Sequence, residues 1–354
     1  MNCIYEKNYF MRRFIQRIVI IGIIFLKGLT VYSQNDSVFK DTVKSRIRVI
    51  IDNDFGGDPD GLFQLAHHIL SPSVEIKGII GSINYKGGFY GSPCTSTYAC
   101  IQVKELLSVM KLKGKLPVYE GGNFGLTDIK IPVLSEGAKA IVQEAMREDT
   151  NKPLYIVCGA GLTNIASAYL MEPRIAKKII LVWIGGGEYD GLTKYPLTDN
   201  KHEYNLGIDI KACQVIFNIS DIPIWQVPRD TYRQALYSYP ELIYKIKTNG
   251  ITGKFLIKKI EDVMKKANRS LGEAYVLGDS PLVLLTALQT SWDADASSSR
   301  YVMKSAPKIN DSGLYEDTSG GREIRVYTGL DTRLMFDDLV AKLAFLKTRN
   351  KKNN

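Results

Sequence analysis

The sequence predicts an α/β fold: one three-layer domain in which a mostly parallel central sheet carries helices on both faces. From about residue 46, apolar strand-like runs alternate with amphipathic helical segments, the order expected for parallel strands joined by helices. The run at residues 49–51 is β-branched, as in a buried strand. No internal repeat and no Pro- or Ser-rich linker interrupts the alternation, so we expect a single domain.

The expected elements follow one another along the chain. A helix opens at residue 62, after the first strand and its turn, and residues 188–202, which lack apolar periodicity, are expected to form a flap or rim loop. The other expected strands cover residues 76–83, 117–119, 154–157, 178–184 and 222–227. The other expected helices cover residues 97–110, 135–147, 163–171, 209–217 and 253–267.

The end of the first strand and the turn after it carry four carboxylates: Asp52, Asp54, Asp58 and Asp60. In open α/β sheets, ligands bind at the carboxyl ends of the strands, where such a turn lies. Acidic side chains this close repel one another, and a bound hard cation relieves that repulsion. Oxygen-only ligands on a flexible loop suit Ca²⁺ or Mg²⁺, so this turn is the candidate metal site, with a solvated acidic turn as the simpler alternative.

Two other interpretations of the turn can be tested on the sequence. An EF-hand loop counted from Asp52 places Gly57 at its glycine position, but Phe63 stands where a bidentate Glu is required, and a strand precedes the loop. This interpretation fails. A phosphotransferase that forms an aspartyl phosphate also begins with Asp-x-Asp after a buried strand, although Gly56 stands where those enzymes carry Thr or Val. It remains open as the weaker alternative.

The composition argues against one class of partner. The 354 residues are 45% hydrophobic and 23% charged, as in an ordinary globular protein, and the net charge is +9. Much of that charge lies in the first 33 residues and in the C-terminal tail 347–352, and no basic stripe with interleaved aromatic residues occurs. Nucleic-acid binding is therefore not expected.

The first 33 residues have the order of a secretory signal peptide. Two arginines precede the apolar segment 18–26, and the short stretch 31–33 follows it. The apolar segment is short for a bilayer span and a lysine ends it, although an uncleaved membrane anchor remains the alternative. We therefore expect an exported protein, periplasmic or extracellular, in which residues 1–33 are removed and residues 34–354 have no membrane attachment.

The cysteines give no metal signature. After removal of the signal, Cys94, Cys100, Cys158 and Cys213 remain, at spacings that match no metal-binding motif. In an oxidising compartment Cys94 and Cys100 could pair across their short loop, and two free thiols are the equal alternative.

Four blocks of the sequence resemble the nucleoside hydrolases, the inosine/uridine-preferring N-ribohydrolase superfamily. They correspond to the family's opening Asp-x-Asp-Pro-Gly-x-Asp-Asp motif, its central block, its sugar-binding block and its last metal-ligand block. In this order they are residues 52–60 (DNDFGGDPD), 157–166 (VCGAGLTNIA) with 172–175 (EPRI), 184–187 (IGGG) with 203–209 (EYNLGID), and 278–281 (GDSP). Four blocks in the family's order, over nearly the whole mature length, are a far more specific signal than any one of them.

The resemblance implies a fold and a function. Enzymes of this superfamily hydrolyse the N-glycosidic bond of nucleosides to ribose and free base, through an oxocarbenium-like sugar. They hold a Ca²⁺ that orients a water and the ribose 2′ and 3′ hydroxyls, and a carboxylate base is still required. We therefore expect residues 34–354 to form a Ca²⁺-dependent ribohydrolase domain with a small-molecule nucleoside or riboside as its partner. Homo-oligomerisation is left open.

Matching the motifs residue by residue implies individual roles. Asp54 would be metal ligand and general base, Asp60 a bidentate ligand, and Asp279 the ligand that closes the shell. The backbone carbonyl of Cys158 would be a further ligand, where the family carries Thr, and Asp52 a ligand or a supporting carboxylate. The residues implied in substrate binding are Asp58 and Asn84 at the ribose hydroxyls, Ile184 in the sugar-binding block, Glu203 and Asn205 at the 5′-hydroxyl, and His202 near the base.

The sequence departs from the family pattern at three points. Pro59 separates Asp58 from Asp60, where the family has adjacent carboxylates, so Asp58 reaches the ribose only if the loop bulges by one residue. Gly278 replaces the histidine that can protonate the leaving base. The Asn expected after the glycine run has only a shifted candidate, Asn200. Activation of the leaving group is therefore the part of the mechanism that the sequence defines least.

Two alternative functions follow from these departures. A non-catalytic ribosyl- or sugar-binding protein could keep the metal and sugar contacts without the histidine. A hydrolase of a different glycoside could use the altered Asp-Pro-Asp loop. Among the remaining residues, His67 and His68 in the first helix are expected to be structural. The aromatic candidates for stacking on a base, most of which are expected to be ordinary core or rim residues, are Tyr85, Phe89, Trp183, Tyr189, Tyr195 and Tyr232.

Overall fold

The computed structural model describes residues 42–352, except 194–200, 291, 293–298 and 317–319. The compact unit that contains these residues runs from Ser37 to Asn354. Residues 1–33 lie outside the described part, so the signal peptide stays a prediction. None of the helices in the described part of the chain is long and apolar enough to cross a membrane.

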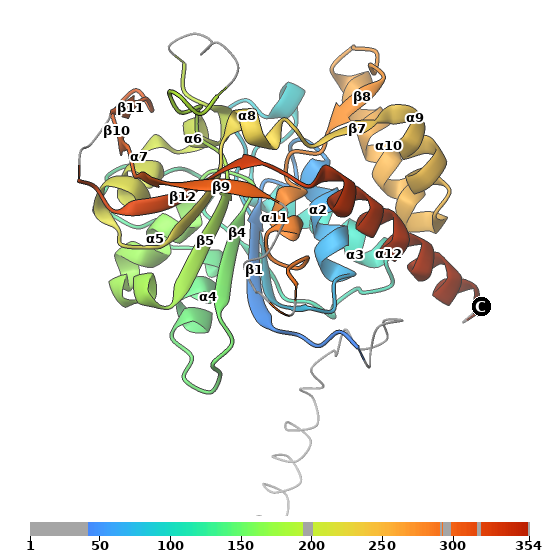
Figure 1. Ribbon diagram of the computed structural model, residues 1–354, viewed down its shortest axis with the longest axis horizontal. Helices are drawn as coiled ribbons and strands as arrows, with labels where there is room; N and C mark the ends of the chain where they lie inside the picture. Colours follow the sequence, from blue (N-terminus) through green and yellow to red (C-terminus); the bar gives the residue numbers. More distant parts are fainter. Residues whose placement is uncertain (1–41, 194–200, 291, 293–298, 317–319, 353–354) are drawn as a thin grey trace, which may run out of the picture. The chain divides into compact units, whose positions relative to one another are not determined.

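A central eight-stranded sheet organises this unit (Figure 1). Its strands are β1 (Ile47–Asn53), β2 (Val74–Gly81), β3 (Val118–Glu120), β4 (Leu154–Cys158), β5 (Ile179–Ile184), β6 (Ile224–Val227), β9 (Arg300–Ser305) and β12 (Glu323–Gly329). The order across the sheet is β3-β2-β1-β4-β5-β6-β12-β9, and only the β12–β9 pair is antiparallel. The six strands predicted from the sequence are all present, and the mostly parallel α/β sheet is confirmed.

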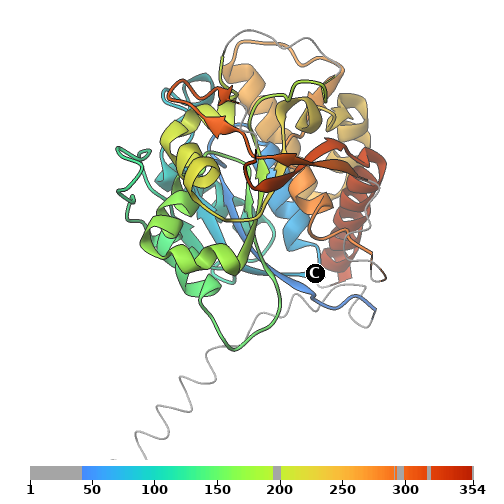
Figure 2. The same ribbon diagram turned by 60° about the vertical axis from the view of Figure 1, so that its left-hand side comes forward.

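Helices cover both faces of the sheet (Figures 1 and 2). The longer ones are α2 (Asp60–Ile69), α3 (Ser96–Val109), α4 (Glu136–Ala145), α5 (Thr163–Met171), α10 (Gly250–Lys266) and α12 (Thr332–Lys352). The shorter ones are α6 (Tyr204–Ile208), α7 (Ile210–Gln214), α8 (Arg229–Tyr232), α9 (Tyr239–Glu241) and α11 (Pro281–Leu284), with single 3₁₀ or π turns at Phe89–Gly91, Pro173–Lys177, Val215–Ile219 and Leu242–Lys247. On one face α4, α5 and α7 share a continuous apolar core with β4, β5 and β6. On the other face α2, α3 and α11 lie nearer the sheet, with α10 and α12 packed against them.

Local sequence explains where the helices near the site begin. The Thr95 side chain accepts a hydrogen bond from Tyr98 N (3.2 Å) at the start of α3, and Ser135 caps α4 in the same way. Helix α2 begins at Asp60, where the helix dipole favours a carboxylate. Every later residue of α2 is buried, so this helix fixes the acidic turn to the core.

Three C-terminal elements were not predicted: β9, β12 and α12. Helix α12 places apolar residues at helical spacing against the core, including Met335, Leu339 and Leu343. The basic residues 347–352 continue this helix. Two short ribbons were also missed, β7 (Leu236–Ser238) with β8 (Ala274–Val276), and β10 (Lys308–Ile309) with β11 (Tyr315–Glu316). The four described cysteines are free thiols, so Cys94 and Cys100 do not pair in this structure.

Candidate active site

The candidate site lies at the carboxyl edge of the central strands. The acidic turn follows β1 at Asn53, Asn84 follows β2, and β4 and β5 end at Cys158 and Ile184. The turn between β8 and α11 adds Asp279. Because parallel strands end at the same edge of a sheet, residues far apart in the sequence meet here. Helices α6 and α8 stand at this edge (Figure 1).

Burial raises the pKa of four carboxylates, those of Asp54, Asp58, Asp60 and Asp279, and neighbouring charges raise three of them further. Burial raises the pKa of Asp54 well above its usual range, and the charges of Asp279 and Asp58 raise it further. Burial raises the pKa of Asp60 in the same way, with added repulsion from Asp279 and Asp58. Burial also raises the pKa of Asp279 to about 7 and that of Asp58 to about 6. Charges shift one another's pKa only over short distances, so these effects show that the four side chains lie close together in the structure.

The inserted Pro59 leaves both neighbouring carboxylates in this cluster. Pro59 stands directly before α2, and Asp60 Oδ1 accepts a hydrogen bond from Gly61 N (2.9 Å). Asp58 Oδ1 accepts one from the Tyr275 hydroxyl (2.8 Å) and one from Asp60 N (3.3 Å). Tyr275 comes from the β7–β8 ribbon, and the sequence analysis did not single it out. It holds Asp58 in the turn before α2.

Asp52 is bonded to a polar network of its own beside the cluster. Its Oδ1 accepts hydrogen bonds from the Ser82 hydroxyl and from Asn164 Nδ2 (3.1 Å). Burial raises its pKa to about 6 although these bonds lower it. The Cys158 thiol lies 3.9 Å from Asp52 Oδ2, and burial holds its pKa well above the usual value, so it stays a neutral thiol. These contacts favour the supporting role of the two alternatives for Asp52.

Asn84 carries an unpartnered buried amide. Its Oδ1 accepts hydrogen bonds from the Tyr204 hydroxyl and from Tyr85 N, both at 2.6 Å. Its Nδ2 has no hydrogen-bond partner in the described part of the chain. A Cβ added at Gly57 would lie 2.6 Å from this nitrogen and 3.2 Å from Asp54 Oδ2, so the amide stands beside the acidic cluster. A buried donor without a partner is costly, which points to a ligand oxygen at this place.

Glu203 and Asn205 close the other side of the site. The buried Glu203 carboxylate accepts hydrogen bonds from Tyr232 Oη (2.9 Å), Gly186 N (2.8 Å) and Leu206 N (3.0 Å). Asn205 Nδ2 donates to the carbonyl oxygens of Ile184 (2.8 Å) and Gly159 (3.3 Å). Ile184 therefore contributes through its backbone, which anchors Asn205 to the end of β5.

Aromatic rings and His202 line the outer rim. The Tyr85 ring centre lies 5.4 Å from that of Tyr204 and 6.4 Å from that of His202, and Phe89 packs edge-on against Tyr204. His202 Nδ1 lies 3.3 Å from the carbonyl oxygen of Ser312. These rings, stacked, tilted or edge-on to one another, form an aromatic rim beside Asn84 that could contact a base. Tyr195 and Asn200 lie outside the described residues.

The position of the missing histidine is partly filled by another ring. A Cβ at Gly278 would lie 3.4 Å from Tyr232 Cδ2 and 3.3 Å from Asp60 Oδ2. Tyr232 thus occupies space that a side chain at residue 278 would reach. Its hydroxyl donates to Glu203, and burial holds its pKa well above the usual value, so it stays protonated.

In the described part of the chain, no three Asp, Glu, His or Cys side chains form a ready-made metal cluster. The carboxylates are close enough to repel one another, yet they do not stand in a coordination sphere. Their chemistry nevertheless fits a hard cation: the donors are oxygens, they are buried, and no basic side chain neutralises them in the contacts that set their pKa.

The comparisons with known proteins identify the family. The family model described as inosine-uridine preferring nucleoside hydrolase matches residues 49–336. A protein of that description from Crithidia fasciculata is 25% identical over 252 residues, which cover 65% of this chain and 75% of the relative. One from Leishmania major is 24% identical over 247 residues, with 64% and 74% covered.

Solved structures show the same fold. A plant nucleoside hydrolase superposes with a TM-score of 0.64 at 19% identity, covering 84% of this chain and 99% of that one. A purine-preferring ribonucleoside hydrolase from Gardnerella vaginalis also gives a TM-score of 0.64, at 18% identity, with 85% and 99% covered.

The fold and the matches together define an N-glycosyl hydrolase of the nucleoside type. The chain belongs to the inosine-uridine preferring nucleoside hydrolase family. It is therefore an enzyme of the N-ribohydrolase class, which removes the aspartyl-phosphate and non-catalytic alternatives.

Proposed function

We propose that the protein hydrolyses the N-glycosidic bond of a nucleoside or related ribosyl compound to ribose and free base, with a calcium ion in the acidic cluster. The observation that carries this proposal is the juxtaposition of four buried carboxylates, which no basic side chain neutralises in the contacts that set the pKa of Asp54 and Asp60, with the unpartnered amide of Asn84. A cation would relieve the repulsion within the cluster, and the free N–H groups of the amide would donate to a polar oxygen such as a sugar hydroxyl.

The residues that would hold the ion are Asp54, Asp60 and Asp279, with the backbone carbonyl of Cys158. Oxygen ligands of this kind prefer calcium or magnesium to zinc. Asp52, bonded to Ser82 and Asn164, would support the strand end rather than bind directly. When bound, the ion supplies positive charge that acidifies a water molecule and attracts the sugar hydroxyls.

Asp54 would act as the general base. Asp54 accepts the proton of the water that attacks the anomeric carbon. The C–N bond breaks, and its electron pair leaves with the nucleobase. The burial that raises the pKa of Asp54 also makes its ionised form a stronger proton acceptor.

The remaining side chains would orient the sugar. Asn84 Nδ2 and Asp58 would bind ribose hydroxyls, and Tyr275 would hold Asp58 for this purpose. Glu203 and Asn205, anchored at the ends of β5 and α6, would bind the 5′-hydroxyl. His202 and the rim rings would contact the nucleobase. Because Gly278 stands where the family has a histidine, no histidine at that position protonates the leaving nucleobase.

Turnover of inosine, uridine and an activated aryl riboside, in calcium and after chelation, tests the proposal. An activated riboside needs no leaving-group acid, so we expect it to react well, and the natural nucleosides more slowly. If none of the three reacts with calcium present while another glycoside does, the sugar assignment is wrong and the different-glycoside alternative takes its place.

Tyr204→Phe is expected to raise KM for nucleosides about fivefold, with a smaller change in kcat. The variant removes the hydroxyl that fixes Asn84 Oδ1, a bond worth roughly 1 kcal/mol, and leaves the amide free to rotate. Tyr169→Phe, far from the site and bonded only weakly to the carbonyl of Ile219, is the matched control. Steady-state kinetics on inosine would refute the role of Tyr204 if both variants behaved alike.

Without calcium, we expect the free energy of unfolding to fall as the pH rises from about 6.5 to 8. In this window Asp279, whose pKa burial raises to about 7, loses its proton only in the folded state, because the unfolded chain has already lost it. Burial and neighbouring charges raise the pKa of Asp54 and Asp60 in the same direction. The folded state binds more protons than the unfolded one, so stability decreases with pH. Below about 6.5 the depressed pKa values of His67 and His68 act in the opposite direction. Thermal unfolding in chelator should therefore show a slope that Asp279→Asn reduces; a flat profile would contradict the cluster.

We also propose that the protein is exported and that mature protein begins near Gln34. The support is the order of charged, apolar and small residues within 1–33. Intact-mass measurement and cell fractionation of natively produced protein check this. A cytoplasmic chain that still carries Met1 or Met11 would show it to be wrong.

A further inference from the structure

A row of buried polar side chains runs behind the acidic cluster. Asn53, Gln64 and His68 are completely buried, and Thr286 is 1% exposed. They come from the end of β1, from α2 and from the segment after α11. Buried polar groups are tolerated only where they bond to one another, so a row of them at a helix–sheet interface requires an explanation.

The hydrogen bonds link these four side chains to a carboxylate of the site. Asn53 Nδ2 donates to Asp279 Oδ2 (2.9 Å) and lies 3.4 Å from Gln64 Oε1. Gln64 Nε2 contacts His68 Nδ1, and His68 Nε2 lies 2.9 Å from Thr286 Oγ1. The Thr286 hydroxyl donates to the carbonyl of Leu282 (2.5 Å). We call Asn53, Gln64, His68 and Thr286 the amide relay.

Only one assignment of donors and acceptors satisfies all the hydrogen bonds of the amide relay. Thr286 gives its hydrogen to Leu282, so it accepts from His68 Nε2, and His68 Nδ1 must then accept from the amide of Gln64. This leaves Gln64 Oε1 facing Asn53 and requires Asn53 to present its NH₂ group. A neutral imidazole is needed throughout, and burial with the neighbouring His67 holds the pKa of His68 well below its usual value.

Asn53 also fixes the backbone of the proposed base. Its Oδ1 accepts a hydrogen bond from Asp54 N (2.8 Å) while its Nδ2 faces Asp279. Two glycines make room for this amide: a Cβ at Gly159 would overlap Asn53 Nδ2, and one at Gly61 would lie 3.0 Å from it. If the amide turned over, its oxygen would face the Asp279 carboxylate and its NH₂ the Asp54 N–H, and both pairs would repel.

We propose that the amide relay holds Asn53 in the one orientation that positions Asp279 and Asp54, and that Gln64 and His68 are positioning residues for the cation. This inference rests on the proposed function, because it assigns those carboxylates to a calcium ion. Groups that orient metal ligands change metal affinity or activity about 10- to 100-fold when they are removed.

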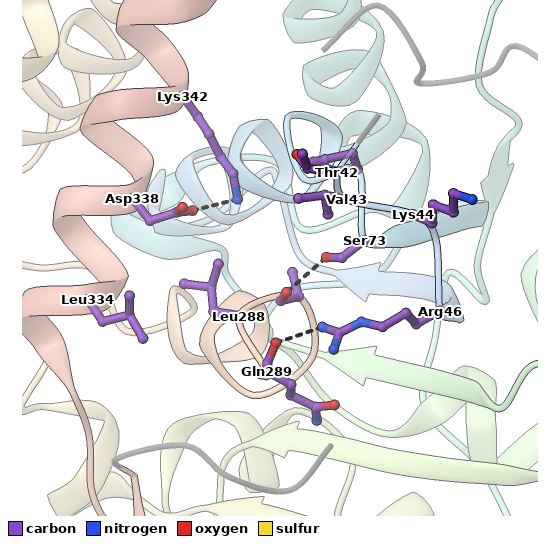
Figure 3. Close-up of a pocket in the computed structure, with 12 residues that line it drawn as sticks. Thr42, Val43, Lys44, Arg46, Ser73, Leu288, Gln289, Leu334, Asp338 and Lys342 are labelled. Carbon is purple, nitrogen blue, oxygen red and sulfur yellow. Dashed lines mark hydrogen bonds and ion pairs between the residues drawn. The ribbon is translucent and has the colours of Figure 1, made fainter. Parts of the chain in front are cut away.

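The other histidine of α2 provides a matched control. His67 is as buried as His68, but its Nε2 bonds to Asp338 Oδ2 (2.7 Å) on α12, away from Asn53. Asp338 also pairs with Lys342 (2.5 Å), and both line a pocket of about 460 Å³ at the amino ends of β1 and β2 (Figure 3). This pocket lies at the end of the strands opposite to the acidic turn.

The test compares Gln64→Met, Gln64→Glu and His67→Gln by calorimetric titration of chelator-treated protein with calcium. Methionine keeps the length of Gln64 and removes its oxygen and NH₂, so calcium affinity is expected to fall at least about tenfold. Glutamate keeps an acceptor for Asn53 and accepts from His68 in its other tautomer, with the Thr286 hydroxyl then turning from Leu282 to donate to Nε2, so it should restore most of the affinity. His67→Gln should bind as the wild type does, and the melting temperature in chelator reports the fold separately.

Thr286→Val, at the far end of the amide relay, is a milder variant should Gln64→Met not fold. It removes the acceptor of His68, and a smaller loss of calcium affinity is expected. The inference is overturned if the wild type binds calcium while the Gln64 and Thr286 variants bind it equally well, or if His67→Gln weakens binding as much. If the wild type binds no calcium and hydrolyses no riboside, the proposed function fails, and this inference fails with it.

Discussion

Asp54→Asn is expected to lower kcat for nucleoside hydrolysis about a hundredfold or more, the usual contribution of a general base. Asparagine has the same shape as aspartate and keeps one side-chain oxygen at the same place. The hydrogen bonds made by the backbone of residue 54 are therefore retained, from its N–H to Asn53 Oδ1 and from Gly57 N to its carbonyl oxygen. What is lost is the ability to accept a proton. The raised pKa of Asp54 makes this loss large, because the ionised carboxylate is a stronger base than an exposed one.

Steady-state kinetics on inosine, uridine and an activated aryl riboside distinguish loss of the general base from loss of leaving-group activation. Loss of the general base slows the hydrolysis of all three substrates. His202→Ala is the matched control, since this half-buried ring stacks near Tyr85 and lies outside the acidic cluster. It should have a small effect, confined to the natural nucleosides. An Asp54→Asn rate within about tenfold of the wild type would assign the base to another residue.

The sheet and its acidic turn were predictable because their signals are local. Residues 49–51 are consecutive β-branched residues, and each predicted strand carries a comparable apolar run. The acidic residues of the first turn are neighbours in the sequence, so their proximity follows from the chain itself. Asp279 was assigned only through the resemblance, and the structure places it in the cluster beside them.

The supporting residues were not predictable because their partners are distant in the sequence. Tyr275 stands on a three-residue strand and reaches Asp58, a contact that no periodicity indicates. Asn53 lies inside the opening motif, yet its role depends on Gln64 and on the fold that brings Asp279 to it. Helix α12 was not predicted because its apolar residues Met335, Leu339 and Leu343 stand in a stretch that is otherwise rich in polar and charged residues and ends in a basic tail.

The second large effect is expected for Asp60→Ala, which removes a carboxylate of the cluster from the first turn of α2. An ion that binds only the folded state stabilises it by an amount that grows with the logarithm of its concentration over Kd, about 2.7 kcal/mol at a hundred times Kd, and we expect calcium in the proposed site to act in this way. The variant should lose most of this stabilisation. In chelator the effect should be small, because loss of the Gly61 hydrogen bond is opposed by relief of repulsion from Asp279 and Asp58.

Comparing stability in calcium with stability in chelator therefore distinguishes loss of a metal ligand from a general loss of stability. Melting curves with and without calcium, together with bound calcium per chain, are compared for wild type, Asp60→Ala and Asp262→Ala. Asp262 is an exposed aspartate of α10 paired with Lys258, so its variant changes the net charge equally without touching the cluster. A general loss of fold would lower both melting curves of Asp60→Ala, whereas loss of a ligand lowers only the curve in calcium. Unchanged calcium content in Asp60→Ala would remove this residue from the metal site and leave Asp54 and Asp279 as its core.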